Sequence, residues 1–174
     1  GCHADLFDYL PVGVTTTPGV IDYTLDDGDV APSFTATVVI EGINDDPVVA
    51  GPIVENYDED NSTGASTTIN LLQGASDADA GETPLLQLAA PPQVTNDPNS
   101  AVSYSGGTTV EVDPALYGSL GAGESQEIIV TYDIVDPQYD PADPTAGGFV
   151  SQTATITITG VNDTPIVPPL SPIS

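Results

Sequence analysis

Residues 151–165 read SQTATITITGVNDTP, a run of alternating residues that ends in glycine, asparagine and aspartate. Ala154, Ile156 and Ile158 alternate with threonines, and this period of two is typical of a strand with one buried face. Residues 33–47 read SFTATVVIEGINDDP and match this stretch without a gap at a constant offset (162 − 44 = 118). The chain therefore contains an internal repeat, and the repeat is built from strands.

The repeat extends upstream of these strands with a different spacing. Residues 23–27 (YTLDD) align with residues 132–136 (YDIVD) at a smaller offset (132 − 23 = 109), so the second copy carries nine more residues (118 − 109 = 9). They fall in an acidic, proline-broken loop at 136–144. The alignment predicts three parts: a partial repeat with its last strands and a linker at 1–46, a complete repeat at 47–165, and the start of a next repeat or an exchanged tail strand at 166–174.

The complete repeat is predicted to be all-β. Clusters of glycine, proline, asparagine and aspartate supply turns, and no segment shows a convincing helical period in a chain with 17 Gly and 17 Pro. Ile128, Val130, Tyr132 and Ile134 share one face of a strand, as packing between two sheets requires. We expect a two-sheet sandwich of seven strands, near residues 48–54, 66–72, 84–90, 100–104, 108–112, 127–135 and 151–159.

The charge of the chain is its most unusual property. It has 26 Asp and Glu, no Lys or Arg, and a formal charge of −26. Uncompensated charge of this size opposes compaction, so folding is expected to need cations, high salt or both. Clustered carboxylates and carbonyls are the ligands that Ca²⁺ takes, which makes Ca²⁺ the expected cofactor. Nucleic acid and anionic membranes are bound through Lys and Arg, so neither is expected as a partner.

The sequence offers little for catalysis. His3 is the sole histidine and stands near a chain end, so a Ser/His/Asp or Cys/His arrangement has no rigid base, and lysine chemistry is impossible. Cys2 is the sole cysteine, which rules out an internal disulfide and leaves an inert thiol or intermolecular pairing. No apolar run is long enough to span a bilayer, so we expect a soluble chain, processed or excised from a longer one, without direct membrane insertion. No enzyme is predicted.

Several acidic groups are spaced for metal binding. Asp77-Ala78-Asp79 places two carboxylates two residues apart in a glycine-flanked loop, which lets both face one cation. Loops at one end of a sandwich converge, so Glu55, Asp136 and the Asn44-Asp45-Asp46 segment add to this pair. The loop with Asp140 and Asp143 is a weaker candidate, and any of these residues could instead cap turns without metal. Residues 58–60 (DED) are expected to form a solvated turn, and residues 61–63 (NST) are a glycosylation sequon.

These motifs resemble a known family. The segments GINDDP at 42–47 and GVNDTP at 160–165 are similar to the inter-domain linker of bacterial cadherin-like and VCBS repeats, which occur in RTX-type adhesins and related surface proteins. The segment SDADAG at 76–81 resembles their Asp-Ala-Asp loop, and residues 23–27 and 132–136 resemble their penultimate strand. The resemblance covers nearly the whole chain and implies immunoglobulin-like (cadherin-like) Greek-key β-sandwich repeats, stiffened by Ca²⁺ at their junctions, at an extracellular or cell-surface location.

The resemblance also implies roles for individual residues. In the segment from Asn44 to Asp46, Asn44 and Asp46 would supply ligands at the junction between repeats. Asp46 would do so through its carbonyl. The remaining ligands would be Asp77, Asp79 and Asp136, with Glu55 bridging to another ion. Glu124 would serve the opposite end of the repeat, beside Asn162 and Asp163.

The expected function is structural. The chain would be a calcium-stabilised repeat, either a subunit of a surface filament or a spacer of an adhesin, and its partners would be neighbouring copies of itself or adjacent repeats. Because residues 1–46 hold strands without their earlier partners, assembly by strand complementation is a further hypothesis, with residues 166–170 or another strand as the donor. The alternative is a calcium-dependent carbohydrate- or peptide-binding adhesion module that recognises surface glycans through Tyr139 in the loop at 136–148.

Overall fold

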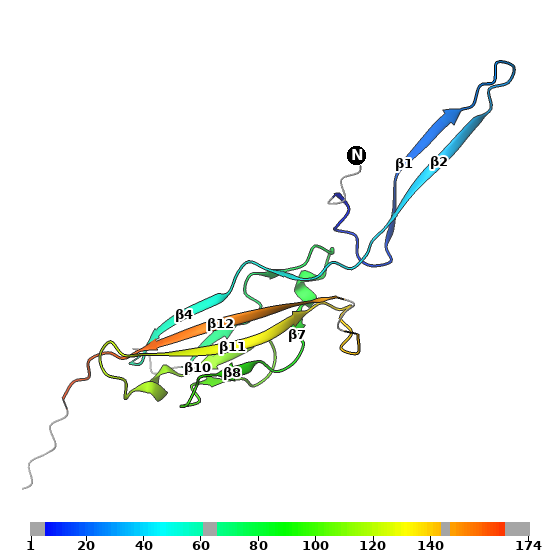
Figure 1. Ribbon diagram of the computed structural model, residues 1–174. Coiled ribbons are helices and arrows are strands. Elements are labelled where there is room, and N and C mark those ends of the chain that lie inside the picture. Colours follow the sequence, from blue (N-terminus) through cyan, green and yellow to red (C-terminus); the bar gives the residue numbers. More distant parts are fainter. Residues whose placement is uncertain (1–5, 61–65, 144–146, 166–174) are drawn as a thin grey trace, which may run out of the picture. The chain divides into compact units, whose positions relative to one another are not determined.

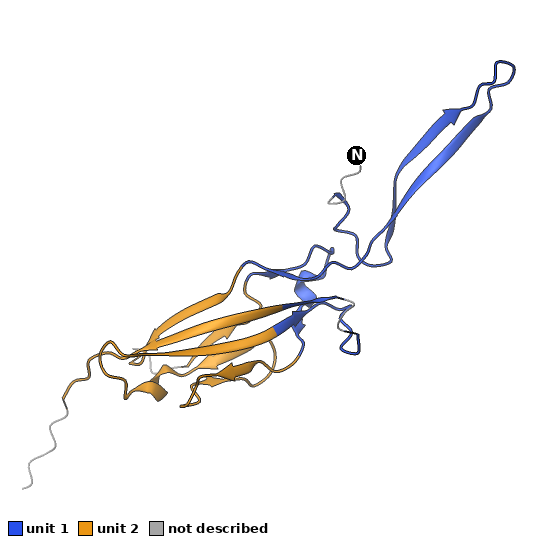
Figure 2. Cartoon of the chain, in the orientation of Figure 1, with its two compact units in different colours: residues 1–50, 74–89, 133–150 blue, residues 51–73, 90–132, 151–174 orange. Residues whose placement is uncertain are grey.

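A computed structural model describes residues 6–60, 66–143 and 147–165. Cys2, His3, the sequon at 61–63 and the tail at 166–174 lie outside the described residues. Within the described part the regular elements are strands and short 3-10 helices, so the all-β prediction is confirmed (Figure 1). No helix among these residues is long and apolar enough to cross a membrane. The chain forms two compact units, unit 1 with residues 1–50, 74–89 and 133–150, and unit 2 with residues 51–73, 90–132 and 151–174 (Figure 2).

Among the described residues, short strands and the 3-10 helices η2 and η3 separate the longer strands. In chain order the elements are β1 (Thr15–Thr24), β2 (Ser33–Glu41), β3 (Val48–Val49), β4 (Ile53–Asp58), β5 (Thr67–Asn70), β6 (Ala75–Ser76), η2 (Thr83–Leu85), β7 (Gln87–Leu88), β8 (Gln93–Thr95), β9 (Val102–Ser103), β10 (Thr109–Val112), η3 (Pro114–Tyr117), β11 (Ser125–Val135) and β12 (Phe149–Thr159).

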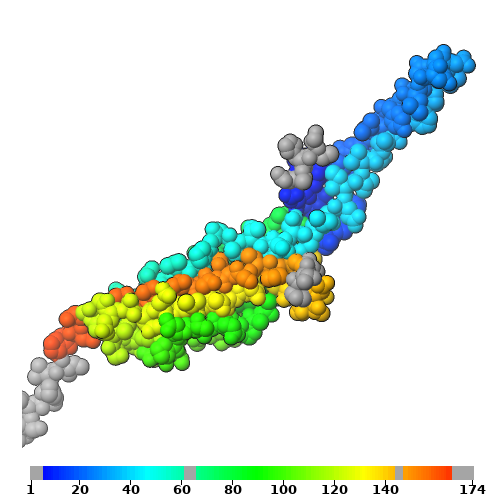
Figure 3. Space-filling view, viewed as in Figure 1, coloured from blue at the N-terminus to red at the C-terminus, as the bar shows by residue number. Residues whose placement is uncertain are grey.

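Unit 2 is a sandwich of two sheets. In one sheet β12 lies between β4 and β11, with β4 parallel to it, and β8 pairs with β11 (Figure 1). Figure 3 shows β11 in yellow and β12 in orange side by side on one surface. The other sheet has the order β5-β10-β9 and is antiparallel. The core consists of buried residues from both sheets, which include Ile69, Val110, Val112, Ile128, Val130, Tyr132, Ala154, Ile156 and Ile158. The predicted sandwich and its inward-facing residues are confirmed.

Two predicted strands differ from the observed ones. The strand expected at 48–54 is divided into β3 and β4, because Pro52 has no N–H to donate to a ladder and interrupts it. The strand expected at 84–90 is only β7, since the 3-10 helix η2, which begins at Thr83 and contains Pro84, lies just before it. The short strands β6 and β8 were not predicted, because two or three residues are too few to show an alternating pattern.

Unit 1 contains a long hairpin of β1 and β2. The strands pair antiparallel from Thr24 opposite Ser33 to Thr15 opposite Glu41, with an irregular register between Thr16 and Gly19. The segment predicted as a partial repeat thus contains two strands, whereas the division of the chain into a partial and a complete repeat stays a prediction. One face of this hairpin is apolar and exposed, and there Tyr23 stacks on Phe34 with ring centroids 5.6 Å apart.

The burial of Glu59 contradicts one prediction. Glu59 was expected in a solvated acidic turn, yet only 1% of its surface is exposed. Its Oε2 accepts a hydrogen bond from the Leu120 N–H at 3.2 Å and its Oε1 accepts one from the Val161 N–H at 2.9 Å. The Glu59 N–H donates to the Thr159 carbonyl at 3.0 Å, which continues the parallel pairing of β4 with β12 by one residue. The carboxylate is buried because two backbone donors satisfy it.

Candidate metal centre

The loop between β6 and η2 arranges the first set of acidic side chains in unit 1. The Asp77 N–H donates to Thr83 Oγ1 at 2.9 Å, and the Asp79 N–H donates to Asp77 Oδ1 at 2.9 Å. The Glu82 N–H then donates to the Asp79 carbonyl at 3.2 Å, which closes the turn before the 3-10 helix. These local bonds are typical of Asx turns, and the bond from Asp79 N–H holds the Asp77 carboxylate within the loop.

Asp136 enters the same region from the end of β11. Only 2% of its surface is exposed, and its Oδ1 accepts a hydrogen bond from the Gln138 N–H at 2.8 Å. Its own N–H donates to the Gly148 carbonyl at 3.0 Å. Gly148 has a φ of +82°, and a Cβ there would stand 2.8 Å from Asp136 Oδ1. Glycine is therefore required at this position both for its backbone conformation and for space.

Three carboxylates from these two segments converge. Asp77, Glu82 and Asp136 each offer one oxygen, and the three oxygens lie within 4.8 Å of one another. Asp79 is 1% exposed and belongs to the same loop. The full sequence contains no Lys or Arg, so neither side chain is available to neutralise these groups. Like charges this close repel by about 3–4 kcal/mol per pair at an effective dielectric constant of 20.

The segment at 44–46 makes two hydrogen bonds to carboxylates of this cluster and a third to Gly148. Asn44 Nδ2 donates to Asp136 Oδ2 at 3.0 Å, and the Asp45 N–H donates to Asp79 Oδ2 at 3.0 Å. Asp46 Oδ1 accepts a hydrogen bond from the Gly148 N–H. The structure therefore brings together six of the seven residues that the sequence suggested as ligands.

Several oxygen atoms at the centre are buried without a hydrogen-bond partner among the described residues. They are Asn44 Oδ1, Asp77 Oδ2, Asp79 Oδ1, Glu82 Oε2 and Gln138 Oε1. Buried acceptors without donors cost free energy, and a cation is the partner that satisfies several of them at once. The donor set consists of oxygen atoms only, with no histidine or thiolate, which suits a hard cation rather than zinc. The residues present therefore fit a calcium ion.

The pKa values of three carboxyl groups agree with this crowding. Burial, and then the charges of Asp79 and Asp136, raise the pKa of Asp77, although the Asp79 N–H bond lowers it in part. Burial also raises the pKa of Glu82, against the lowering effect of its hydrogen bond from Gln138. The pKa of Asp45 is raised by burial first and then by Asp79 and Asp8. In each case the charged form is disfavoured, which a bound cation would reverse.

The other residues that the sequence suggested as metal ligands are not among the three converging carboxylates. Glu55 is on β4 in unit 2, opposite Ile156, and its bridging role stays a prediction. Asp140 Oδ1 accepts a hydrogen bond from the Ala142 N–H at 2.8 Å, which makes this segment an exposed Asx turn. Glu124 accepts a bond from the Gly121 N–H at 2.9 Å and is exposed.

The proposed recognition loop places Tyr139 against Phe149. The two rings meet edge to face with centroids 5.8 Å apart and an interplanar angle of 63°. Residues 144–146 of this loop lie outside the described residues. Because the Tyr139 ring already has an aromatic partner, its geometry gives no specific support to sugar stacking.

Sequence reasoning missed two residues of the centre. Glu82 stands three residues after Asp79, and Gln138 stands two residues after Asp136; Gln138 Nε2 donates to Glu82 Oε1 at 2.6 Å. Glu82 could have been found, because it closes the same turn as the Asp77 and Asp79 pair. Gln138 could not, since its contact joins two loops that are 56 residues apart in sequence.

Comparisons with known proteins give limited information. No family model matches the chain, and no curated protein matches its sequence. A solved structure of mouse clustered PcdhgC3 EC1-3 is similar over 91% of this chain, with 18% sequence identity and a TM-score of 0.43. The chain spans 45% of the length of that protein chain.

Proposed function

We propose that this chain is a calcium-stabilised structural repeat of an extracellular surface protein, either a subunit of a surface filament or a spacer of an adhesin. The observation that carries the proposal is the buried carboxylate cluster of Asp77, Glu82 and Asp136, together with its unpartnered oxygens. Without a cation, repulsion within this cluster would destabilise the fold.

Calcium fits the cluster better than magnesium. Ca²⁺ takes six to eight oxygen ligands in flexible geometry, whereas Mg²⁺ keeps several waters and seldom uses an all-protein cage. Asn44, Asp77, Asp79 and Glu82 each hold a buried oxygen without a hydrogen-bond partner in the described structure. These four would hold the ion together with Asp136, and the ion would supply the positive charge that the chain lacks.

The role of the site would be mechanical. The linker at 44–46 bonds to the Asp77 loop through Asp79 and to the β11 end through Asp136. An ion bound among these groups would add ligand bonds to the same contacts, so the linker would lose freedom to rotate. A series of repeats joined in this way would form a stiff connection, which is the property that filaments and spacers need.

The test is thermal unfolding followed by circular dichroism in calcium, in magnesium and after a chelator. At a free calcium concentration of about 100 times Kd, a ligand that binds only the folded state stabilises it by about 2.7 kcal/mol. We expect this gain in calcium, a smaller one in magnesium, and full reversal by chelator. Equal unfolding curves in all three conditions would refute the proposal. Electron microscopy of the calcium-loaded protein separates long filaments from short rods.

A further inference from the structure

Three carboxylates of the metal centre share one pattern of hydrogen bonding. Asp77 Oδ1 accepts a bond from the Asp79 N–H at 2.9 Å, whereas Asp77 Oδ2 is buried without a partner among the described residues. Asp79 Oδ2 accepts a bond from the Asp45 N–H at 3.0 Å, and Asp79 Oδ1 has no such partner. Glu82 repeats the pattern, with Oε1 bonded and Oε2 unpartnered. Each carboxylate is thus held by one oxygen and keeps the other open to a cation.

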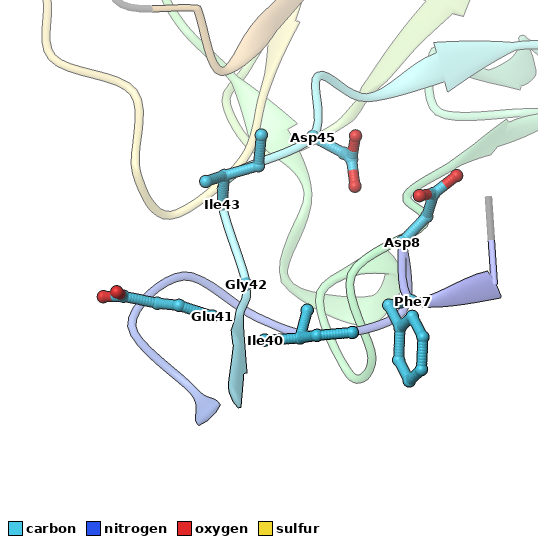
Figure 4. Close-up of a pocket in the computed structure, with 7 residues that line it drawn as sticks. All are labelled: Phe7, Asp8, Ile40, Glu41, Gly42, Ile43 and Asp45. Carbon is cyan, nitrogen blue, oxygen red and sulfur yellow. The ribbon is translucent and has the colours of Figure 1, made fainter. Parts of the chain in front are cut away.

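The three donors that hold these carboxylates differ in kind. Two are backbone N–H groups, those of Asp79 and Asp45, and a side-chain substitution does not remove them. The Asp45 side chain itself lines a cavity beside the linker, where Figure 4 shows its carboxylate on the same side as that of Asp8. The third donor is a side chain, because Gln138 Nε2 bonds to Glu82 Oε1 at 2.6 Å. Gln138 is therefore the donor whose role a substitution can test.

Gln138 is attached to two ligands of the centre at once. Its backbone N–H donates to Asp136 Oδ1 at 2.8 Å, and its side-chain amide donates to Glu82. An ionised carboxylate only accepts hydrogen bonds, so the nitrogen end of the amide must face Glu82, and this fixes which end is the carbonyl. That carbonyl oxygen, Gln138 Oε1, is buried and has no hydrogen-bond partner among the described residues. Burial without a partner costs free energy, which a bound cation would offset.

Asn44 has the same arrangement on the other side of Asp136. Its Nδ2 donates to Asp136 Oδ2 at 3.0 Å, and its Oδ1 is buried without a partner in the described structure. Both amides therefore use their nitrogen on a ligand carboxylate and leave their oxygen free. Ca²⁺ takes the side-chain carbonyls of Asn and Gln as ligands together with carboxylates. A neutral ligand also adds coordination without adding repulsion to a site that already holds several negative charges.

We propose that Gln138 is a further, neutral ligand of the calcium centre: its Oε1 binds the ion while its Nε2 holds Glu82 to binding through one oxygen. This inference rests on the proposed calcium site and extends its ligand set. Gln138 brings the number of residues that hold the ion from five to six, which reaches the six to eight oxygens that Ca²⁺ takes. Because Mg²⁺ keeps several of its waters, the amide oxygen favours calcium over magnesium.

The first test is isothermal titration calorimetry of the full chain and its Gln138→Met variant with calcium and with magnesium. Methionine keeps the length of the side chain but has neither the amide nitrogen nor the carbonyl oxygen. We expect the Kd for calcium to rise about tenfold, since residues that hold and orient metal ligands contribute at least this much to affinity. The loss for magnesium should be smaller. Gln93→Met, the same change at an exposed position on β8, should bind calcium like the parent.

The second test needs only the parent chain. With ¹³C in the side-chain carbonyl of glutamine, NMR follows each Cδ signal, and the Gln138 signal is assigned by through-bond correlation to its backbone. We expect this signal to move on addition of calcium, to move less with magnesium and to return with chelator, while the Gln93 signal stays in place.

The outcomes separate this inference from the proposed function. A parent chain that binds calcium with a stationary Gln138 signal would overturn the inference and leave the calcium site intact. A Gln138→Met variant that binds calcium as tightly as the parent would do the same. A parent chain that binds no calcium in the calorimeter would refute the metal centre, and the role of Gln138 with it.

Discussion

At the scale of single residues, the destabilising effect of Glu82 is the clearest consequence of the structure. Glu82 is 6% exposed, and one of its oxygens lies close to oxygens of Asp77 and Asp136. Without a cation its charge is destabilising, and with a cation it is a ligand. A single substitution should therefore change stability in opposite directions in the two conditions.

Glu82→Gln removes this charge while keeping the size of the side chain. In chelator we expect the variant to be more stable than the parent by about 1 kcal/mol, since repulsion and desolvation are relieved. In calcium we expect it to be less stable by about 1–2 kcal/mol, because a ligand is lost. Urea unfolding measures both values. Glu111→Gln is the matched control on an exposed position, and a Glu82→Gln change of the same sign in both conditions would count against the site.

The pH dependence of stability in chelator follows from the same carboxyl groups. The pKa values of Asp77, Glu82 and Asp45 are raised in the folded state, so the folded state binds protons more tightly than the unfolded state does. Stability contributed by these groups therefore rises as pH falls from neutral through the raised pKa values, and the gain is complete below the ordinary values of 3.8 and 4.5.

Urea unfolding in chelator at a series of pH values between about 7 and 5 measures this trend. We expect the Glu82→Gln variant to show a smaller gain on acidification than the parent. In calcium we expect the stability of the parent to fall as the pH falls, since protons compete with the ion for the same oxygens. A parent protein in chelator that loses stability steadily over this range would contradict the pKa directions.

At the scale of elements, the end of β4 is fixed by Glu59. Its carboxylate joins β4 to the loop at Leu120 and to the linker at Val161. Glu59→Ala would leave two backbone donors without this acceptor, and we expect a loss of about 1–3 kcal/mol in the free energy of unfolding, with or without calcium. Asp58→Ala is the adjacent control, because Asp58 is exposed. A Glu59→Ala chain with unchanged urea stability would show that the two bonds contribute little.

The elements also show what could be predicted from sequence. Strands β11 and β12 were predicted from their alternation, because every second residue is buried from Ile128 to Ile134 and from Gln152 to Ile158. The burial of Glu59 could not be predicted, since it depends on the parallel register between β4 and β12 that brings it to Val161. The convergence of Asp77 and Asp136 was predicted from loop geometry, whereas Gln138 was found only when the two loops were in place.

At the scale of the whole molecule, a charge of −26 without Lys or Arg explains why cations should control folding. Most of this charge is exposed and is screened by salt over about 8–10 Å at physiological ionic strength. The buried cluster is screened far less, so a specific ion is needed there. General salt dependence and specific calcium dependence are therefore separate properties of the chain, and only the second depends on Asp77, Glu82 and Asp136.

The most direct test of a calcium-bound centre is a crystal structure of the protein grown in calcium, with the ion located by its anomalous scattering. We predict a calcium ion at about 2.3–2.6 Å from oxygens of Asp77, Glu82 and Asp136, with the Asn44 side-chain oxygen in its coordination shell. Calcium found only on exposed groups such as Asp140, or no ordered ion at all, would contradict the central claim.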